Sequence, residues 1–86
     1  MLVRWSLHAK HRFAERAAKH GLNYGDLELE IKNQKVKIKE GNGRFKTVFE
    51  AGGIILTAAK IETRDFIHVL TLWEANEEEA MIWKKK

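Results

Sequence analysis

Three side chains that could bind an anion follow one another at a spacing of four residues. They are His8, Arg12 and Arg16, in the segment SLHAKHRFAERAAKHGL over residues 6–22. Residues four apart lie on one side of a helix, so these groups would form a line along it. A guanidinium group carries a fork of N–H donors that matches phosphate or carboxylate oxygens. The spacing indicates an anion-binding stripe, although a solvated helix face shows the same pattern, and both interpretations stay open.

The segment that carries this stripe has the features of an amphipathic helix. At about 100° per residue, its apolar side chains gather on the arc opposite the stripe, with Phe13 as the large anchor. Ser6 can cap the first turn through its hydroxyl group, and Gly21 can adopt the left-handed conformation that ends a helix. We therefore expect a helix between these two residues, packed through its apolar arc against a sheet.

A second group of basic residues lies in residues 35–50, where apolar and polar residues alternate on either side of a Gly-Asn-Gly turn. This pattern predicts a β-hairpin. The positions expected to face the core are Val36, Ile38, Phe45 and Phe49. On the opposite face we then expect Lys35, Lys37, Lys39, Arg44 and Lys46. The like charges of such a face either are screened by solvent, protect an edge strand from aggregation, or bind a nucleic-acid backbone.

Histidine changes its charge near neutral pH, which suits it to metal binding and to proton transfer. The sequence contains His8, His11, His20 and His68. No cysteine- or glutamate-rich motif accompanies the first two, so we expect neither a metal site nor a cofactor. His68 lies in an apolar segment and is either a hydrogen-bonded histidine at the edge of the core or a general acid or base for RNA cleavage through the 2′-hydroxyl group. In the second role it needs a partner, for which the candidates are His8, Arg12 and Arg16.

The composition excludes several kinds of protein. The 86 residues include no cysteine, so we expect neither a disulfide framework nor a thiolate metal site. No apolar run approaches the roughly 18 residues of a membrane span, and the opening MLVRWSLHAK is too polar for a secretory signal. We expect a single domain over residues 1–86, located in the cytoplasm. The net charge of +4 favours an anionic partner.

The other segments predict the elements that must position these side chains. Residues 23–32 have helical spacing, while residues 54–61 and 66–73 are apolar on both faces, as in the central strands of an antiparallel meander. Residues 2–5 either form an edge strand or pack under the first helix. Residues 77–86 form a helix capped by Asn76 and docked through Trp83 and either Ala80 or Met81, or, alternatively, a fifth strand. The expected core consists of Phe13, Phe45, Phe49, Leu56 and Leu70.

These predictions give an α+β fold: two N-terminal helices packed on a four-stranded antiparallel meander, with a short C-terminal helix. The pattern Ser6-x-His8-Ala9-x-x-Arg12-x-x-Glu15-Arg16 then resembles a domain-of-unknown-function family whose helix reads S-x-H-A-x-x-R-x-x-x-R. That family is similar in layout to the RelE and BrnT ribonuclease toxins. The resemblance implies two N-terminal helices against a curved sheet and metal-free endoribonuclease activity in a toxin–antitoxin setting.

The sequence departs from the toxin pattern in three respects, one of which is a glutamate-rich tail that the pattern does not contain. Its first helix is expected to run about a turn longer, and no basic triad like that of RelE toxins stands on the last strands, where Lys60, Arg64 and His68 are available. Two functions from different classes therefore stay open. One is a toxin-like enzyme that binds and cleaves RNA, with Arg12 or Arg16 stabilising the transition state. The other is a non-catalytic module that binds nucleic acid, RNA rather than DNA, or an acidic, antitoxin-like protein.

Overall fold

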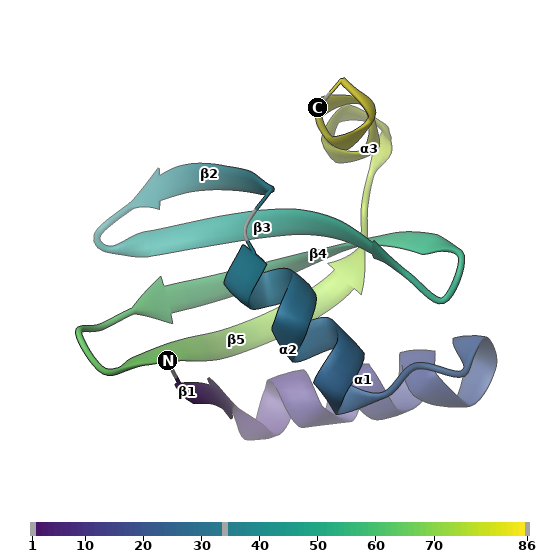
Figure 1. Cartoon of the computed structure of the whole chain (residues 1–86), viewed down its shortest axis with the longest axis horizontal. Coiled ribbons are helices and arrows are strands. Elements are labelled where there is room, and N and C mark those ends of the chain that lie inside the picture. The colour runs from purple at the N-terminus through teal and green to yellow at the C-terminus, as the bar shows by residue number, and fades with distance from the viewer. Residues whose placement is uncertain (1, 34, 86) are drawn as a thin grey trace.

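The computed structural model describes residues 2–33 and 35–85, which form one five-stranded sheet and three helices (Figure 1). The strands are β1 (Leu2–Trp5), β2 (Val36–Gly41), β3 (Arg44–Ala51), β4 (Ile54–Glu62) and β5 (Phe66–Glu74). The helices are α1 (Leu7–His20), α2 (Tyr24–Asn33) and α3 (Glu77–Lys84). The strand order is β1-β5-β4-β3-β2. The predicted α+β class is confirmed, and none of these described helices is long and apolar enough to cross a membrane.

β1 pairs with β5 in parallel, which makes the sheet mixed instead of antiparallel. The backbone N–H of Ser6 then donates to the carbonyl of Val69 (2.9 Å), and the chain turns directly into α1. Of the two interpretations of this segment, the edge strand is the right one. The predicted antiparallel meander of β2 to β5 is present, but the prediction of four strands is wrong, because β1 extends the sheet in the described part of the chain.

α1 begins and ends at the predicted residues because both caps form. The Ser6 hydroxyl accepts a hydrogen bond from the N–H of Ala9 (3.0 Å) and donates one to the carbonyl of Leu70 on β5 (2.7 Å). Gly21 takes a left-handed conformation with φ of 67°, and its N–H donates to the carbonyl of Ala17 (2.9 Å). Ser6 therefore fixes both the start of the helix and its position on the sheet.

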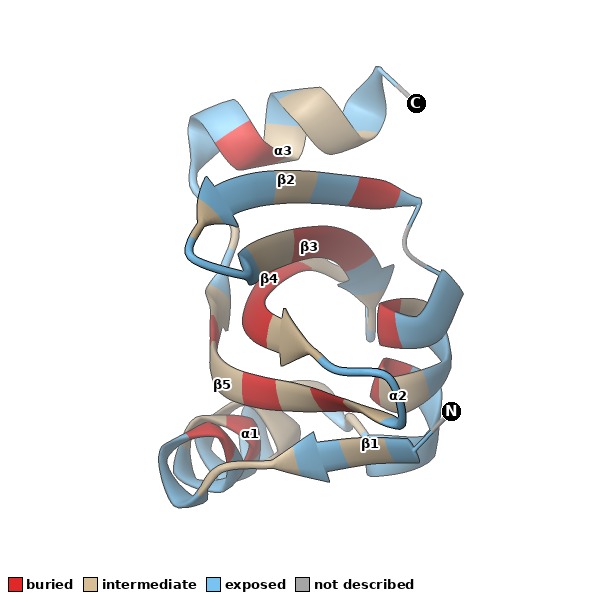
Figure 2. Ribbon diagram, turned by 90° about the vertical axis from the view of Figure 1, so that its left-hand side faces the viewer, coloured by how far each residue is buried: buried red, intermediate tan, exposed pale blue. Residues whose placement is uncertain are grey.

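The core lies between α1 and α2 and one face of the curved sheet; Figure 2 shows buried segments in both layers. Side chains alternate between the two faces along each strand, except that the pairing of β4 with β5 passes over Leu70, so Val69 and Leu72 both enter this core. The buried cluster consists of Ala9, Phe13, Leu27, Ile31, Phe49, Leu56, Ala58, Ile67, Val69 and Leu72. Phe13, Phe49 and Leu56 are buried together as predicted, whereas Phe45 and Leu70 are only half-buried.

β2 and β3 form the predicted hairpin, but a bulge changes its register. The pairing is irregular between Lys39 and Gly41, where Glu40 has no cross-strand partner. Gly41 pairs with Arg44 and Lys39 with Phe45, so one residue of β2 is passed over. A shift of one residue moves every side chain of one strand to the other face of the sheet.

The bulge overturns the prediction that all the basic residues of the hairpin share a face. Ile38 pairs with Lys46 and Lys37 with Thr47, and directly opposed residues share a face. Lys37 and Lys39 therefore lie on the same face as the core phenylalanine Phe49. The other face, opposite α1 and α2, is called the open face from here on.

α3 lies against the open face at β3, so the helical interpretation of the tail is the right one. α1 and α3 stand at opposite ends of the molecule (Figures 1 and 2). Asn76 and Glu79 form a capping box: the Asn76 amide oxygen accepts from the N–H of Glu79 (2.8 Å), and the Glu79 carboxylate accepts from the N–H of Asn76 (3.0 Å). Of the predicted docking residues, Trp83 and Ala80 are half-buried and Met81 is exposed. The buried residue of α3 is Glu79.

Candidate nucleic-acid interface

The predicted stripe on α1 is present, with its side chains in different surroundings. His8 is exposed in the first turn. The Arg12 guanidinium lies 3.8 Å from the carboxylate of Glu15, with 43% of the side chain exposed. Arg16 is closer to the sheet, where its Nε lies 3.9 Å from an oxygen of Glu74. The stripe thus borders solvent at one end of α1 and the end of β5 at the other.

His68 does not join this stripe. Its neighbours Ile67 and Val69 are buried in the core beneath α1, so the intervening His68 side chain points to the open face. The side chains of the stripe lie on α1, which covers the core face. The sheet therefore separates His68 from His8, Arg12 and Arg16, and the predicted pairing across helix and strand does not form.

The open face gives His68 different basic neighbours. The register pairs Arg4 with His68, His68 with Ile61, and Ile61 with Arg44, in one cross-strand row over four adjacent strands. Both arginines are exposed, and His68 and Ile61 are half-buried. This set, called the cationic row from here on, places an imidazole between two guanidinium groups on one surface.

Phe66 extends the cationic row with an aromatic ring. The guanidinium carbon of Arg4 lies 4.5 Å from the centre of this ring, and the rings of Phe66 and His68 have centroids 6.4 Å apart. Aromatic rings beside arginines are the groups on which unpaired RNA bases stack. The row therefore offers charge for phosphates and a ring for a base.

The basic residues of the hairpin are divided between the two faces. Lys35 and Lys39 are exposed. The Lys37 ammonium lies 4.2 Å above the ring of Phe45 and donates to Glu62 (2.7 Å). On the open face, Arg44 belongs to the cationic row, while Lys46 is bound to α3. The sequence thus predicted one basic surface where the structure has two smaller ones.

Lys60 is buried on the core face and shares a carboxylate with Lys37. Its ammonium donates to Glu62 (2.9 Å), and its side chain is fully buried. Burial lowers the pKa of Lys60 below 10.5, while the hydrogen bond and the charge of Glu62 oppose that shift. This lysine belongs to the interior of the protein and is not available to a polyanion.

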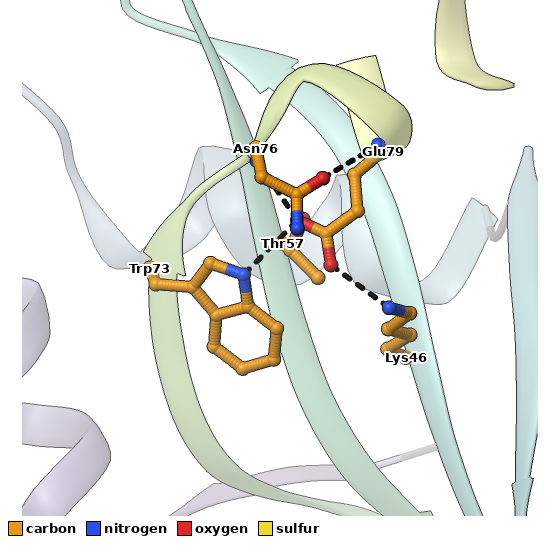
Figure 3. Close-up of polar contacts among 5 residues, drawn as sticks. All are labelled: Lys46, Thr57, Trp73, Asn76 and Glu79. Atoms are coloured by element: carbon orange, nitrogen blue, oxygen red, sulfur yellow. Dashed lines mark hydrogen bonds and ion pairs between the residues drawn. The ribbon is translucent and has the colours of Figure 1, made fainter. Parts of the chain in front are cut away.

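The Glu79 carboxylate is held on the open face by several donors (Figure 3). One oxygen accepts from the Thr57 hydroxyl (2.9 Å), the Trp73 indole N–H (3.1 Å) and the N–H of Asn76 (3.0 Å). The other accepts from the Lys46 ammonium (2.9 Å). Burial raises the pKa of Glu79, but these hydrogen bonds lower it by more, so it lies below 4.5. The glutamate is therefore charged at neutral pH.

The helix side of the molecule carries charge of both signs, because α1 bears the basic stripe and α2 borders an acidic cleft. A cleft of about 260 Å³ lies between α2 and the β3–β4 turn, and its lining includes Asp26, Glu30 and Glu50. A polyanion avoids such a surface. Among residues 2–33 and 35–85, no three histidine, cysteine or carboxylate side chains gather as a metal ion would require. The open face, which carries the cationic row, is the candidate surface for an anion.

Two features of the open face escaped prediction. Arg4 is a single arginine in a short apolar segment, and nothing in the sequence indicates that this segment pairs with β5. Glu79 is the other: it completes the capping box with the predicted cap Asn76. Three side chains from separate strands bind its carboxylate: Lys46, Thr57 and Trp73. Only the sheet register brings them together.

These elements define a class: an α+β fold in which N-terminal helices cover one face of a curved mixed sheet. Within it, the chain is similar to the crystal structure of the Brucella abortus ribonuclease toxin BrnT. The TM-score is 0.60 at 20% sequence identity, over 90% of this chain and 100% of that chain. No protein-family model and no curated protein matches the sequence. At this identity, the likeness shows that the chain has a fold like that of a ribonuclease toxin.

Proposed function

We propose that this chain is a toxin-like RNA-binding protein that holds RNA on the open face and cleaves it without a metal ion. The observation that supports the proposal is the cationic row, in which His68 stands between Arg4 and Arg44. The fold shared with a ribonuclease toxin favours the same function. An acidic, antitoxin-like protein that covers this face is the partner expected with it.

The spacing of the row suits one phosphate and its neighbours. Arg4 lies one strand away from His68, and Arg44 lies two strands away. Adjacent strands are about 4.8 Å apart. Arginine side chains are long enough to bend over the space between them. A phosphate held by both guanidinium groups would lie above the imidazole, and Phe66 would stack against a neighbouring base.

Cleavage needs a proton acceptor and charge stabilisation. His68 takes the proton of a ribose 2′-hydroxyl group, and the 2′-oxygen attacks the adjacent phosphorus. The bond from phosphorus to the 5′-oxygen breaks, and this leaving group takes a proton from water. The products are a 2′,3′-cyclic phosphate and a 5′-hydroxyl. Arg4 and Arg44 stabilise the negative charge of the pentacovalent transition state.

A second function, binding without cleavage, is supported by a separate observation. Within the cationic row, His68 is the one side chain that can act as a general acid or base. Ribonucleolytic cleavage is faster when a second group protonates the leaving oxygen. A binding module for RNA or for an acidic protein needs only the arginines and the ring.

The test is incubation of the purified protein with labelled single-stranded RNA in EDTA. We expect cyclic-phosphate products from the parent protein and none from His68→Ala. Arg44→Ala should slow cleavage by about a hundredfold or more, the usual effect of losing one transition-state donor. Arg12→Ala, on α1, and the exposed Lys10→Ala should cleave at the parental rate. Melting temperatures of all variants show whether each is folded.

The same set of variants identifies the other possibilities. If His68→Ala cleaves as fast as the parent, the proposed acceptor is wrong. If Arg12→Ala loses cleavage and Arg44→Ala does not, the site lies on the α1 stripe predicted from the sequence. Binding that depends on Arg44, with no products from the parent, identifies the non-catalytic module.

A further inference from the structure

We infer that Lys46, Thr57 and Trp73 form a phosphate-binding site on the open face, and that Glu79 of α3 occupies this site as an internal competitor of RNA. The inference rests on the proposed function, which it deepens by adding a second phosphate position and a means of controlling access to it. RNA that reaches this position must displace the glutamate and with it α3.

The donors around Glu79 are those of an anion site. An ammonium, a hydroxyl and an indole N–H from three neighbouring strands converge on one carboxylate, at 2.9, 2.9 and 3.1 Å (Figure 3). Carboxylate and phosphate oxygens accept the same charge-assisted hydrogen bonds. The three donors stand on the rigid sheet, and the acceptor alone comes from α3. Removal of α3 would therefore leave the donor set in place.

This site continues the cationic row. Lys46 is two residues from Arg44 on β3 and so lies on the same face. Two residues of an extended strand span about 7 Å. Lys46 pairs with Ala59, and Ala59 pairs with Thr71. These three residues form the cross-strand row next to the one that contains His68. A strand of RNA that places one phosphate over His68 could therefore place another at Lys46.

α3 is held to the sheet in a way that suits displacement. Its buried residue is the charged Glu79, while Met81 is exposed and Ile82 and Trp83 are half-buried. No apolar side chain of α3 is fully buried, so this helix opens at lower cost than an element with a buried apolar face. The hydrogen bond and charge of Glu79 raise the pKa of Lys46 against the opposing effect of burial, so the lysine is charged while Glu79 is bound to it.

The experiment measures binding of a single-stranded oligoribonucleotide to the full chain carrying Glu79→Gln. The matched control is Glu77→Gln, which removes the same charge from an exposed position of the same helix turn. We expect Glu79→Gln to bind about fivefold tighter or more, the lower range for coupling between two ligands, and Glu77→Gln to match the parent. The salt dependence of Glu79→Gln should steepen by about 0.7, the value for one added phosphate contact on a single strand.

A second substitution assigns the gain to this site. Lys46→Gln should abolish the gain in the Glu79→Gln background but have little effect in the parent, where Lys46 is already paired. Indole N–H signals in NMR spectra, with Trp73→Phe for assignment, show that each variant is folded and should shift at Trp73 when RNA is added to Glu79→Gln.

The outcomes separate this inference from the proposed function. If the parent binds RNA through Arg44 but Glu79→Gln binds no tighter than Glu77→Gln, the inference is wrong and the proposed function stands. If neither the parent nor Glu79→Gln binds RNA, both are wrong. If Glu79→Gln does not fold, Glu79→Asp tests the same point, because its shorter carboxylate weakens the contact with Lys46; unchanged affinity in that variant would also refute the inference.

Discussion

Lys60 places a charge inside the sheet. Its side chain is fully buried on the core face, between Phe45 and Val69 on the adjacent strands. Glu62 accepts from this ammonium with one oxygen and from Lys37 with the other. Removing the partner of a buried charge destabilises a protein strongly. Replacing the charged residue by an apolar one of similar volume costs far less. Glu62 therefore stabilises the charge of the buried Lys60.

Two variants test this account. Glu62→Gln should lower the free energy of unfolding by about 3 kcal/mol, because the Lys60 charge stays buried without a carboxylate. Lys60→Met removes the charge and fills similar volume, so it should cost less than about 1.5 kcal/mol. Urea unfolding at pH 7 measures both. A Lys60→Met protein less stable than Glu62→Gln would contradict this role of Glu62.

The carboxylates of Glu62 and Glu79 also set the pH dependence of stability. Burial raises the pKa of Glu62 and of Glu79, and hydrogen bonds lower both by more, to below 4.5. The folded chain therefore binds fewer protons than the unfolded chain just below pH 4.5. The stabilisation is complete above that pH and is lost as the pH falls through the folded pKa. Melting temperatures should fall below about pH 4.5, and less steeply for Glu79→Gln than for Glu77→Gln.

At the scale of elements, the hairpin shows what alternation predicts and what it leaves open. β2 and β3 each alternate as the sequence indicates, and each is a strand. Their relative register depends on the chain at the turn, where the bulge at Glu40 passes over one residue. Without it, Lys39 would face Lys46 and the predicted basic face would exist. Periodicity within a strand carries no information on such a bulge.

The β3–β4 turn contacts the connection between α1 and α2 at Gly52, and this contact can be tested. A Cβ at Gly52 would lie 2.5 Å from Cδ2 of Leu22 and 2.9 Å from the carbonyl oxygen of His20. Gly53 also has a positive φ, but nothing lies within 4 Å of its Cβ position. Both alanine variants adopt an unfavourable backbone conformation. Gly52→Ala should therefore be less stable than Gly53→Ala by about 1 to 3 kcal/mol, the cost of overpacking. Equal losses in chemical denaturation would contradict the close contact.

For the whole molecule, the sequence predicts local features well and long-range pairing poorly. Ser6, Gly21 and Asn76 mark helix ends through their own side chains or backbone, so the helices could be placed. The parallel pairing of β1 with β5 joins residues far apart in the chain, and no local pattern reports it. The cationic row depends on that pairing. The sequence therefore predicts the individual basic side chains, whereas the register decides that His68 lies beside Arg4 and not beside the stripe on α1.

Phe49 tests the core on which the whole fold depends. It is buried with Phe13 and Leu56 between the sheet and the helices. Phe49→Ala should lower the free energy of unfolding by about 3 to 5 kcal/mol through lost contacts and the cavity left behind. Phe45→Ala, at a half-buried position of the same strand, is the control and should cost less. A melting temperature of Phe49→Ala within a few degrees of the parent would show that Phe49 is not part of the core.

The pairing of β1 with β5 has a consequence for the order of events during synthesis. Leu2 leaves the ribosome 64 residues before Phe66, its partner in the sheet, and Ser6 likewise precedes the Leu70 carbonyl that it binds by 64 residues. Contacts between distant parts of a chain form late in folding. β1 and α1 therefore lack their contacts with β5 until β5 has been synthesised. α3 is translated after β5, so a nascent chain can expose Lys46 and Thr57 before Glu79 exists to cover them.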